Sequence, residues 1–364
     1  MKTKNYGLLD VCRIFAAILV IAIHIGPLEF LNKTGDYIFT GIIARIGVPF
    51  FLMITGYFVI ARFAGMKADS GRWKTVWRFI KKTGLLYTAA MILYLPVNIY
   101  AGQLPLWTER TNTQAGLWIF KLFKFIFVDG TFYHLWYFPA VIFGVAFVCL
   151  LLEKMSVKAV FAVSVVLYGI GLLGDSYYGL VLSVPVLASI YDGIFTVCEY
   201  TRNGLFYVPV FLMLGCMLAG KRANLRRNGL AFGLSMAAMI TEGLILYFLR
   251  WQRHDSMYIF LIPAAYTCFG FLLAYCRRVG VPPALGLRMR NIAMLMYVLH
   301  PLVLIGVRGM DKILGLHGSL NGNGLMMYVL VTLISAAVSS VMAVFMGKIQ
   351  RIFQRRHFDG NRRL

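Results

Sequence analysis

The sequence contains little charge and few acidic side chains. Of its 364 residues, 14% are charged and only 14 are Asp or Glu, whereas 60% are hydrophobic and the mean hydropathy is +0.75. Polar residues this scarce could not cover a water-facing surface, which excludes an ordinary soluble globular domain. Apolar runs of about 20 residues recur along the chain, so we predict an integral membrane protein.

Cysteine is also scarce and carries no recognisable pattern. Five of the six cysteines lie in or beside apolar runs, only Cys198 falls in a probable loop, and no Cys-x-x-Cys pair occurs. This distribution predicts neither a disulfide framework nor a zinc site, so we expect no metal.

Ten apolar segments are long enough to cross a hydrocarbon layer of about 30 Å. The sequence therefore predicts an all-α integral membrane protein, a bundle of about ten transmembrane helices. The predicted spans are approximately Leu8–Phe30, Ile38–Ala61, Ile80–Tyr100, Trp136–Leu152, Val157–Leu173, Leu205–Ala219, Leu230–Leu249, Met257–Tyr275, Ile292–Val307 and Leu325–Met346.

Basic residues exceed acidic ones by 22, and the predicted topology accounts for the excess. With the N-terminus inside, inner loops hold 25 of the 36 Lys and Arg residues and outer loops hold nine. Membrane proteins concentrate basic loops on the cytoplasmic side. We therefore predict a multi-pass protein of the cell (cytoplasmic) membrane with both termini cytoplasmic, and no nucleic-acid partner.

Two further apolar stretches are not predicted to cross. If Leu180–Thr196 did cross, the inner and outer counts would become 16 and 18, and the charge bias would vanish. We expect a short re-entrant or surface helix there and an interfacial helix over Leu117–Val128. The predicted domains are a membrane domain over residues 1–347 and a basic cytoplasmic tail over residues 348–364.

Ionisable residues within the spans are the candidates for function, because each costs on the order of 3 kcal/mol near the bilayer centre. Arg13 and His24 are 11 positions apart, which places them within about 20° of one helix face and about 16 Å apart along the axis. Asp10 precedes Arg13 by three residues and can pair with it. Alternatively, Arg13 extends to the inner headgroups and His24 only bonds a carbonyl at the helix end.

The second span adds Arg45, followed by Pro49, which frees a backbone carbonyl and suggests a polar cavity. An interhelical ion pair without a ligand is the alternative. The fourth span opens with His134 and Trp136; an aromatic belt alone would explain the tryptophan.

The ninth span carries Tyr297 and His300, followed by Pro301. His300 is either a functional group or a histidine that caps a carbonyl freed by the proline. Buried Arg and His with almost no acidic partners favour an anionic guest such as a phosphate-bearing ligand. Proton-coupled transport more often needs an intramembrane carboxylate, and only Glu242 is a plausible one.

At these positions the sequence resembles the acyltransferase-3 family of polytopic membrane acyltransferases. The match consists of Arg13 and His24 with ten residues between them, Arg45–Phe51 continuing to Thr55, the His134–Trp136 element, and Tyr297 with His300-Pro301. Within the family the chain is most similar to the membrane domain of membrane-bound serine racemases linked to vancomycin resistance. We expect no racemase domain here.

The resemblance implies a membrane-bound O-acyltransferase that moves an acyl group, expected to be acetyl, from acyl-CoA to a hydroxyl of an extracytoplasmic sugar or cell-envelope acceptor. It assigns His24 as the general base. The implied contacts to acyl-CoA or acceptor are Asp10, Arg13, Arg45, Thr55, His134, Trp136, Tyr297 and His300. Acetyl-CoA or another acyl-CoA serves as donor substrate, the lipid bilayer is the other partner, and a homodimer is allowed for. The alternative is a transporter of a small polar solute such as L-serine.

Overall fold

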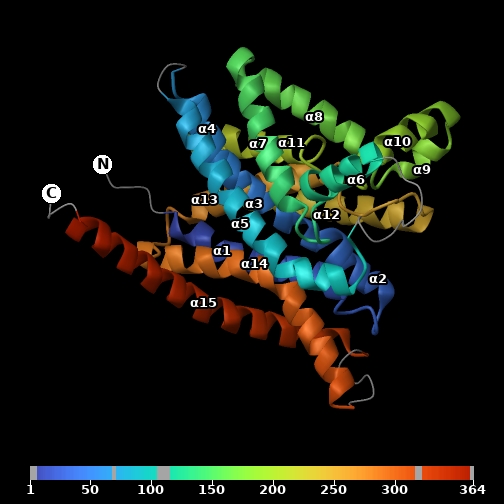
Figure 1. Ribbon diagram of the computed structural model, residues 1–364. Coiled ribbons are helices and arrows are strands. Elements are labelled where there is room, and N and C mark those ends of the chain that lie inside the picture. Colours follow the sequence, from blue (N-terminus) through green and yellow to red (C-terminus); the bar gives the residue numbers. More distant parts are fainter. Residues whose placement is uncertain (1–5, 68–70, 105–114, 316–321, 361–364) are drawn as a thin grey trace. The chain divides into compact units, whose positions relative to one another are not determined.

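The computed structural model describes residues 6–67, 71–104, 115–315 and 322–360 (Figure 1). Within these ranges every regular element is helical and none is a strand. Seven helices there are long and apolar enough to span a membrane. The all-α class and the membrane-helical character are therefore confirmed, whereas the count of ten spans and the cytoplasmic termini remain predictions.

The seven span candidates are α1 (Gly7–Ile25), the interrupted helix Lys33–Ala64, α5 (Arg72–Tyr100), α7 (Tyr137–Lys154), α12 (Leu225–Leu249), α14 (Pro283–Ile313) and the first part of α15 (Gly324–Gly360). Three other predicted spans correspond to shorter apolar helices of 17, 11 and 15 residues, namely α8 (Val157–Leu173), α11 (Val208–Leu218) and α13 (Leu261–Tyr275). A straight crossing takes about 20 residues, so hydropathy alone does not decide whether these three span.

Both stretches that we predicted not to cross form short helices. The first is α6 (Ala115–Phe127), and the second divides into α9 (Tyr178–Leu182) and α10 (Pro185–Val197), with Pro185 at the helix start where proline needs no N–H partner. In the predicted basic tail, residues 348–360 continue α15, and residues 361–364 lie outside the described residues.

The interrupted helix Lys33–Ala64 contains three turns that are not α-helical. It begins with α2 (Lys33–Asp36), passes through a π-helical turn, η1 (Tyr37–Ile42), and a 3-10 turn, η2 (Ile43–Ile46), and continues as α3 (Gly47–Thr55), a second π-helical turn, η3 (Gly56–Ile60), and α4 (Ala61–Ala64). Pro49 contributes to the break because it has no N–H to donate to the carbonyl of Arg45, four residues earlier. Such winding changes within helices are frequent at functional sites.

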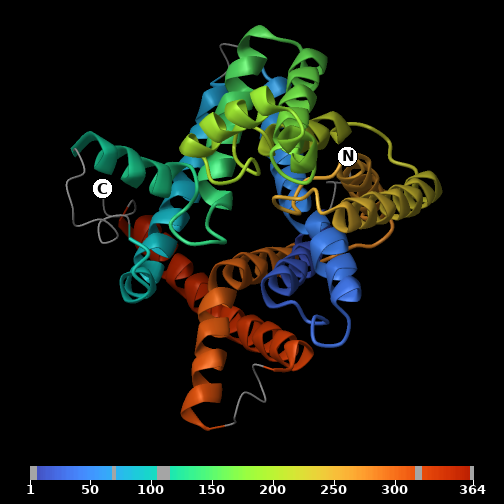
Figure 2. The same ribbon diagram turned by 90° about the vertical axis from the view of Figure 1, so that its right-hand side faces the viewer.

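The chain divides into two compact units, and each is described separately. The first comprises residues 1–48 and 272–364. In it α1 packs against α14, and α15 packs against both (Figure 1). The hydroxyl of Tyr328 on α15 donates to the carbonyl of Ile18 on α1 at 3.3 Å. Helix α14 is bent, and Pro301 lies inside it (Figure 2).

The second unit comprises residues 49–271 and is built around α11. Ten of the 11 residues of α11 are buried, because η3, α7 and α8 pack on it. Gly56 and Gly215 make the closest approach: a Cβ on Gly56 would collide with the backbone of Leu212, and one on Gly215 would collide with that of Met53. Small residues let membrane helices pack this closely.

Candidate active site

His24 lies in the last turn of α1, next to the residue that ends the helix. Gly26 adopts a left-handed conformation with φ 66° and donates its N–H to the carbonyl of Ala22 at 3.0 Å. Glycine reaches this conformation without the strain that a Cβ would cause. Since α1 is α-helical from Gly7 to Ile25 without interruption, Arg13 and His24 keep the spacing that the sequence predicted.

The imidazole of His24 stacks on that of His300. Their ring centroids are 5.4 Å apart and the planes differ by 22°. Tyr297 is the third member of this group, with its ring centroid 6.3 Å from that of His300. Two histidines and a tyrosine that the sequence singled out on two different spans are therefore neighbours within the first unit.

His300 also supplies a hydrogen-bond donor to α14 at the position where Pro301 lacks one. Its ring is fully buried, and Nδ1 lies 2.9 Å from the carbonyl oxygen of Tyr297 and 3.2 Å from that of Met296. Pro301 has no N–H for the carbonyl of Tyr297, four residues earlier, so the imidazole supplies the missing donor. A carbonyl oxygen only accepts, so Nδ1 carries a proton, and in the uncharged ring Nε2 then carries the lone pair.

Asp10 and Arg13 form an ion pair near the start of α1. The Nε atom of Arg13 lies 3.1 Å from Oδ1 of Asp10, and both side chains are 22% exposed. Arg290 of α14 is near enough to act on the same carboxylate. The predicted pairing is therefore present, and a second cation accompanies it at this end of the helix.

Arg45 lies in the 3-10 turn η2, which packs against α1. The adjoining Gly47 makes the close contact, since a Cβ there would lie 3.1 Å from the carbonyl oxygen of Ala16 and 3.6 Å from Cβ of Leu19. The half-buried Arg45 side chain thus starts from a turn that lies beside the middle of α1.

Asp36 is a buried acidic residue that the sequence analysis missed. It is 8% exposed and organises the turn after α1: Oδ1 accepts from the N–H of Leu28 at 2.8 Å, and Oδ2 accepts from the hydroxyl of Thr40 at 3.2 Å. A Cβ on Gly26 would lie 3.4 Å from Oδ2. Asp36 immediately precedes an apolar run, so it looked like an ordinary loop residue.

In the second unit, His134 is buried in an aromatic enclosure. It is 1% exposed, and its ring contacts those of Tyr94 at 5.0 Å, Tyr133 at 5.5 Å and Phe132 at 5.7 Å between centroids. Trp136, 9% exposed, carries the guanidinium of Arg202 over its ring at 4.9 Å. A cation over an indole face is a favourable contact. In the sequence analysis, Arg202 was only one of the nine basic residues of the predicted outer loops.

Helix α5 holds the loop that carries His134. Asn98 donates from Nδ2 to the carbonyl of Thr131 at 2.7 Å, while the hydroxyl of Tyr87 donates to the carbonyl of Ile126 at 2.7 Å and accepts from the N–H of Thr131 at 3.3 Å. Because Asn98 and Tyr87 satisfy buried backbone groups, they fix the loop. Single-sequence reasoning had no signal for them, since each lies in an apolar run.

Thr55 and Glu242 have structural contacts in the second unit. The hydroxyl of Thr55 donates to the carbonyl of Phe51 at 3.2 Å. Glu242 accepts hydrogen bonds from the hydroxyl of Tyr177 at 2.8 Å and from the N–H groups of Ile259 at 2.6 Å and Phe260 at 2.9 Å, just before α13. A carboxylate at a helix start satisfies N–H groups that lack partners within the helix.

Six of the nine predicted site residues thus belong to the first unit, and Thr55, His134 and Trp136 belong to the second. Within the first unit, His24, Tyr297 and His300 form one group and Asp10 with Arg13 another. In the part of the chain that the structure describes, no three His, Cys, Asp or Glu side chains are grouped so that they could hold a metal ion.

The chain is similar to two proteins of Enterococcus faecalis named amino-acid racemases. One is 38% identical over 283 residues, covering 77% of this chain and 38% of the relative, and the other is 34% identical over 362 residues, covering 99% and 49%. A serine/alanine racemase of Enterococcus gallinarum is 33% identical over 335 residues, covering 91% and 45%. The chain therefore spans half or less of the length of these relatives. No solved structure matches it.

A family model described as "Acyltransferase domain" matches residues 6–344. That range contains all nine predicted site residues and both compact units almost completely. The chain is accordingly a member of the acyltransferase-3 family, as its Arg and His pattern indicated.

Proposed function

We propose that this protein moves an acyl group, specifically acetyl, from acyl-CoA to a hydroxyl of an extracytoplasmic sugar or cell-envelope acceptor, with His24 as the general base. The observation that carries the proposal is the stacking of His24 on His300 of α14, 5.4 Å apart, because His24 shares α1 with the Asp10–Arg13 pair. Membership of the acyltransferase-3 family supplies the reaction class.

In the proposed reaction, an unprotonated nitrogen of His24 takes the proton of the acceptor hydroxyl as its oxygen attacks the thioester carbonyl. The new C–O bond forms, the C–S bond breaks, and the proton passes from the imidazolium to the departing CoA thiolate. General base catalysis of this kind contributes roughly 10²- to 10⁴-fold. His300 holds one face of the His24 ring and so restricts the directions in which His24 can accept a proton.

Arg13, near the other end of α1, is proposed to contact the phosphates of acyl-CoA, since a guanidinium binds phosphate with two parallel N–H groups. The rise of about 16 Å between Arg13 and His24 separates a phosphate contact from the reacting thioester. The long pantetheine arm of CoA is the part of the donor that would lie between them.

Transport of L-serine is the second candidate, and the name of the serine/alanine racemase relative favours it. Since this chain matches less than half of that relative, its name alone does not decide between the two functions.

The deciding experiment uses purified protein in proteoliposomes with [¹⁴C]acetyl-CoA on the Arg13 side. The enzyme proposal expects saturable acetyl-CoA binding, slow hydrolysis to acetate and CoA, and faster release of CoA when a suitable hydroxyl acceptor takes the acetyl group. Uptake of labelled L-serine without acetyl-CoA, together with absence of acetyl-CoA binding, would establish the transporter instead. His24→Ala serves as the control, because it should retain donor binding and lose hydrolysis.

A further inference from the structure

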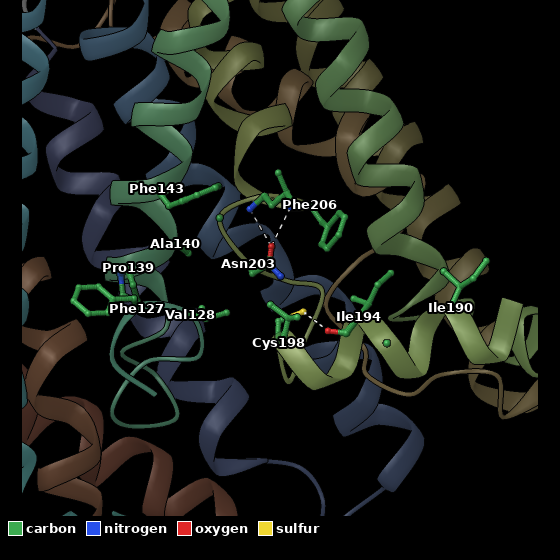
Figure 3. Close-up of a pocket in the computed structure, with 14 residues that line it drawn as sticks. Phe127, Val128, Pro139, Ala140, Phe143, Ile190, Ile194, Cys198, Asn203 and Phe206 are labelled. Atoms are coloured by element: carbon green, nitrogen blue, oxygen red, sulfur yellow. Dashed lines mark hydrogen bonds between the residues drawn. The ribbon is translucent and has the colours of Figure 1, made fainter. Parts of the chain in front are cut away.

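The second unit contains an apolar pocket of about 530 Å³ that no step of the proposed reaction uses (Figure 3). The end of α6, the start of α7, the second half of α10 and the segment before α11 form its wall. The lining residues are Phe127, Val128, Pro139, Ala140, Phe143, Ile190, Gly193, Ile194, Val197, Cys198, Asn203, Gly204, Leu205 and Phe206. The volume lies within the range of about 300–1,000 Å³ that is typical of small-molecule sites.

The few polar groups in the wall are satisfied by the wall itself. Asn203 accepts from the N–H groups of Leu205 at 2.9 Å and Phe206 at 3.1 Å, and its Nδ2 donates to the carbonyl of Tyr200 at 3.0 Å. The thiol of Cys198 donates to the carbonyl of Ile194 (Figure 3). The pocket therefore selects for an apolar guest, since a polar one would lose its hydrogen bonds with water.

The rim of the pocket continues the apolar outer surface of the protein. Phe127 is 58% exposed, Ile190 53%, Val197 52% and Phe143 49%, and all four line the pocket. In a membrane-helical protein, exposed side chains of this kind face lipid chains. The pocket is therefore continuous with the apolar outer surface of the protein.

Two basic side chains make contacts that hold the wall elements of the pocket in place. Lys124 on α6 donates to the carbonyls of Thr196 at 3.3 Å and Phe195 at 3.5 Å at the end of α10, and it pairs with Asp129 at 3.7 Å. Arg253 stacks over the ring of Phe195 at 3.7 Å. Because these contacts join the wall elements without a guest, the pocket is preformed, which lowers the cost of binding.

We propose that this pocket binds a single hydrocarbon chain of a membrane lipid. Its apolar wall, internally satisfied polar groups and continuity with the lipid-facing surface all match this occupant. The proposal does not depend on the acyltransferase reaction, and its test does not use activity as a readout.

The test is photolabelling in proteoliposomes of phosphatidylglycerol that include a phosphatidylglycerol with a diazirine in mid-chain. We expect the label to concentrate on residues 137–143 and 190–198 relative to the lipid-exposed face of α12. Gly193→Leu should lower pocket labelling about tenfold, which corresponds to about 1.4 kcal/mol of binding. Gly193 lines the pocket and a Cβ there meets open space, so we expect the leucine side chain to occupy part of the pocket without a clash.

Gly233→Leu on α12 is the matched control, since Gly233 is also an exposed helical glycine whose Cβ direction is open. It should leave pocket labelling unchanged. If Gly193→Leu lowers the yield of folded protein, Ile190→Trp provides the same blockage at a 53% exposed rim position. Wild-type labelling no denser in the pocket than on α12, or undiminished labelling in a folded pocket-filling variant, would overturn the proposal.

Discussion

The imidazoles of His24 and His300 stack at 5.4 Å between centroids, although they are 276 positions apart in the chain. His24 lies two residues before Gly26, the C-cap of α1, and His300 lies beside the proline inside α14. Each histidine thus occupies a place where the helical hydrogen-bond pattern stops or fails. Because Pro301 has no N–H, the carbonyl of Tyr297 bonds the His300 ring instead and fixes its position. The ring of His24 then stacks on the ring of His300.

His24→Ala is expected to reduce acyl transfer by about 10²- to 10⁴-fold with membrane level and donor binding nearly unchanged, because a general base acts in the chemical step. His24→Gln should fail to a similar extent, since an amide keeps a hydrogen bond but accepts no proton. Rates and acetyl-CoA affinities of the purified variants provide the check. Full activity of His24→Gln would assign His24 a structural role only.

Arg13→Ala should weaken acyl-CoA binding, and Arg13→Lys should recover part of it, because an ammonium replaces the charge of a guanidinium but not its paired N–H groups. Titration calorimetry with a non-hydrolysable acyl-CoA measures both variants. Arg62→Ala, at an exposed position on α4, is the control for general loss of positive charge. An unchanged affinity in Arg13→Ala would mean that Arg13 only contacts lipid headgroups and Asp10.

The two roles of His300 can be separated by restoring the missing backbone donor. His300→Ala leaves the carbonyl of Tyr297 without the imidazole, and an unsatisfied buried polar group costs about 1–3 kcal/mol. In His300→Ala/Pro301→Ala, the N–H of residue 301 can bond that carbonyl again, so thermal stability should largely return while acyl transfer stays low. Recovery of both stability and acyl transfer would mean that His300 serves only to bond the backbone carbonyl of Tyr297.

Asp175, in the turn between α8 and α9, is the centre of a buried polar cluster in the second unit. Its Oδ1 accepts from the N–H groups of Ser256 at 2.8 Å and Met257 at 2.9 Å and from the hydroxyl of Ser176 at 3.0 Å. Nδ1 of His254, which also contacts the Ser256 hydroxyl, lies 3.6 Å from Oδ2.

Burial raises the pKa of Asp175 to about 7, and the nearby carboxylate of Asp255 adds to the rise. The folded protein therefore holds this proton more tightly than the unfolded chain does, and the stabilisation is complete below about pH 4 and is lost as the pH rises through about 7. We expect the melting temperature in detergent to fall between pH 5 and pH 8. Asp175→Asn, which cannot ionise, should flatten this dependence; an identical slope in both proteins would contradict it.

The predicted topology places the two ends of α5 on opposite sides of the membrane. In a variant without native cysteines, Lys67→Cys and Gln103→Cys introduce exposed thiols before and after this helix. An impermeant maleimide added to intact cells should label Gln103→Cys only. Labelling of Lys67→Cys under the same conditions would reverse the assignment of the inner side.

Local properties of the sequence determined the class of the protein and the spacing of its candidate residues. Hydropathy is summed along a continuous segment, so it identified α1, α5, α12 and α14 without reference to the rest of the chain. The relation between Arg13 and His24 follows from helix periodicity alone, and it holds because α1 has no interruption. The residues on which the family resemblance rests all lie within the range that the family model matches.

Only the tertiary structure decided which of those residues meet. The contact of His24 with His300 depends on α1 packing against α14, a pairing that no local pattern encodes. Hydropathy also predicted too early a start for the short helix α11, at Leu205, because Asn203 bonds the N–H groups of Leu205 and Phe206 and keeps that apolar segment in a turn until α11 begins at Val208. Asp36, Asn98 and Tyr87 became recognisable only through their buried partners. The role of such a side chain depends on the groups that other residues bring to it in the folded structure.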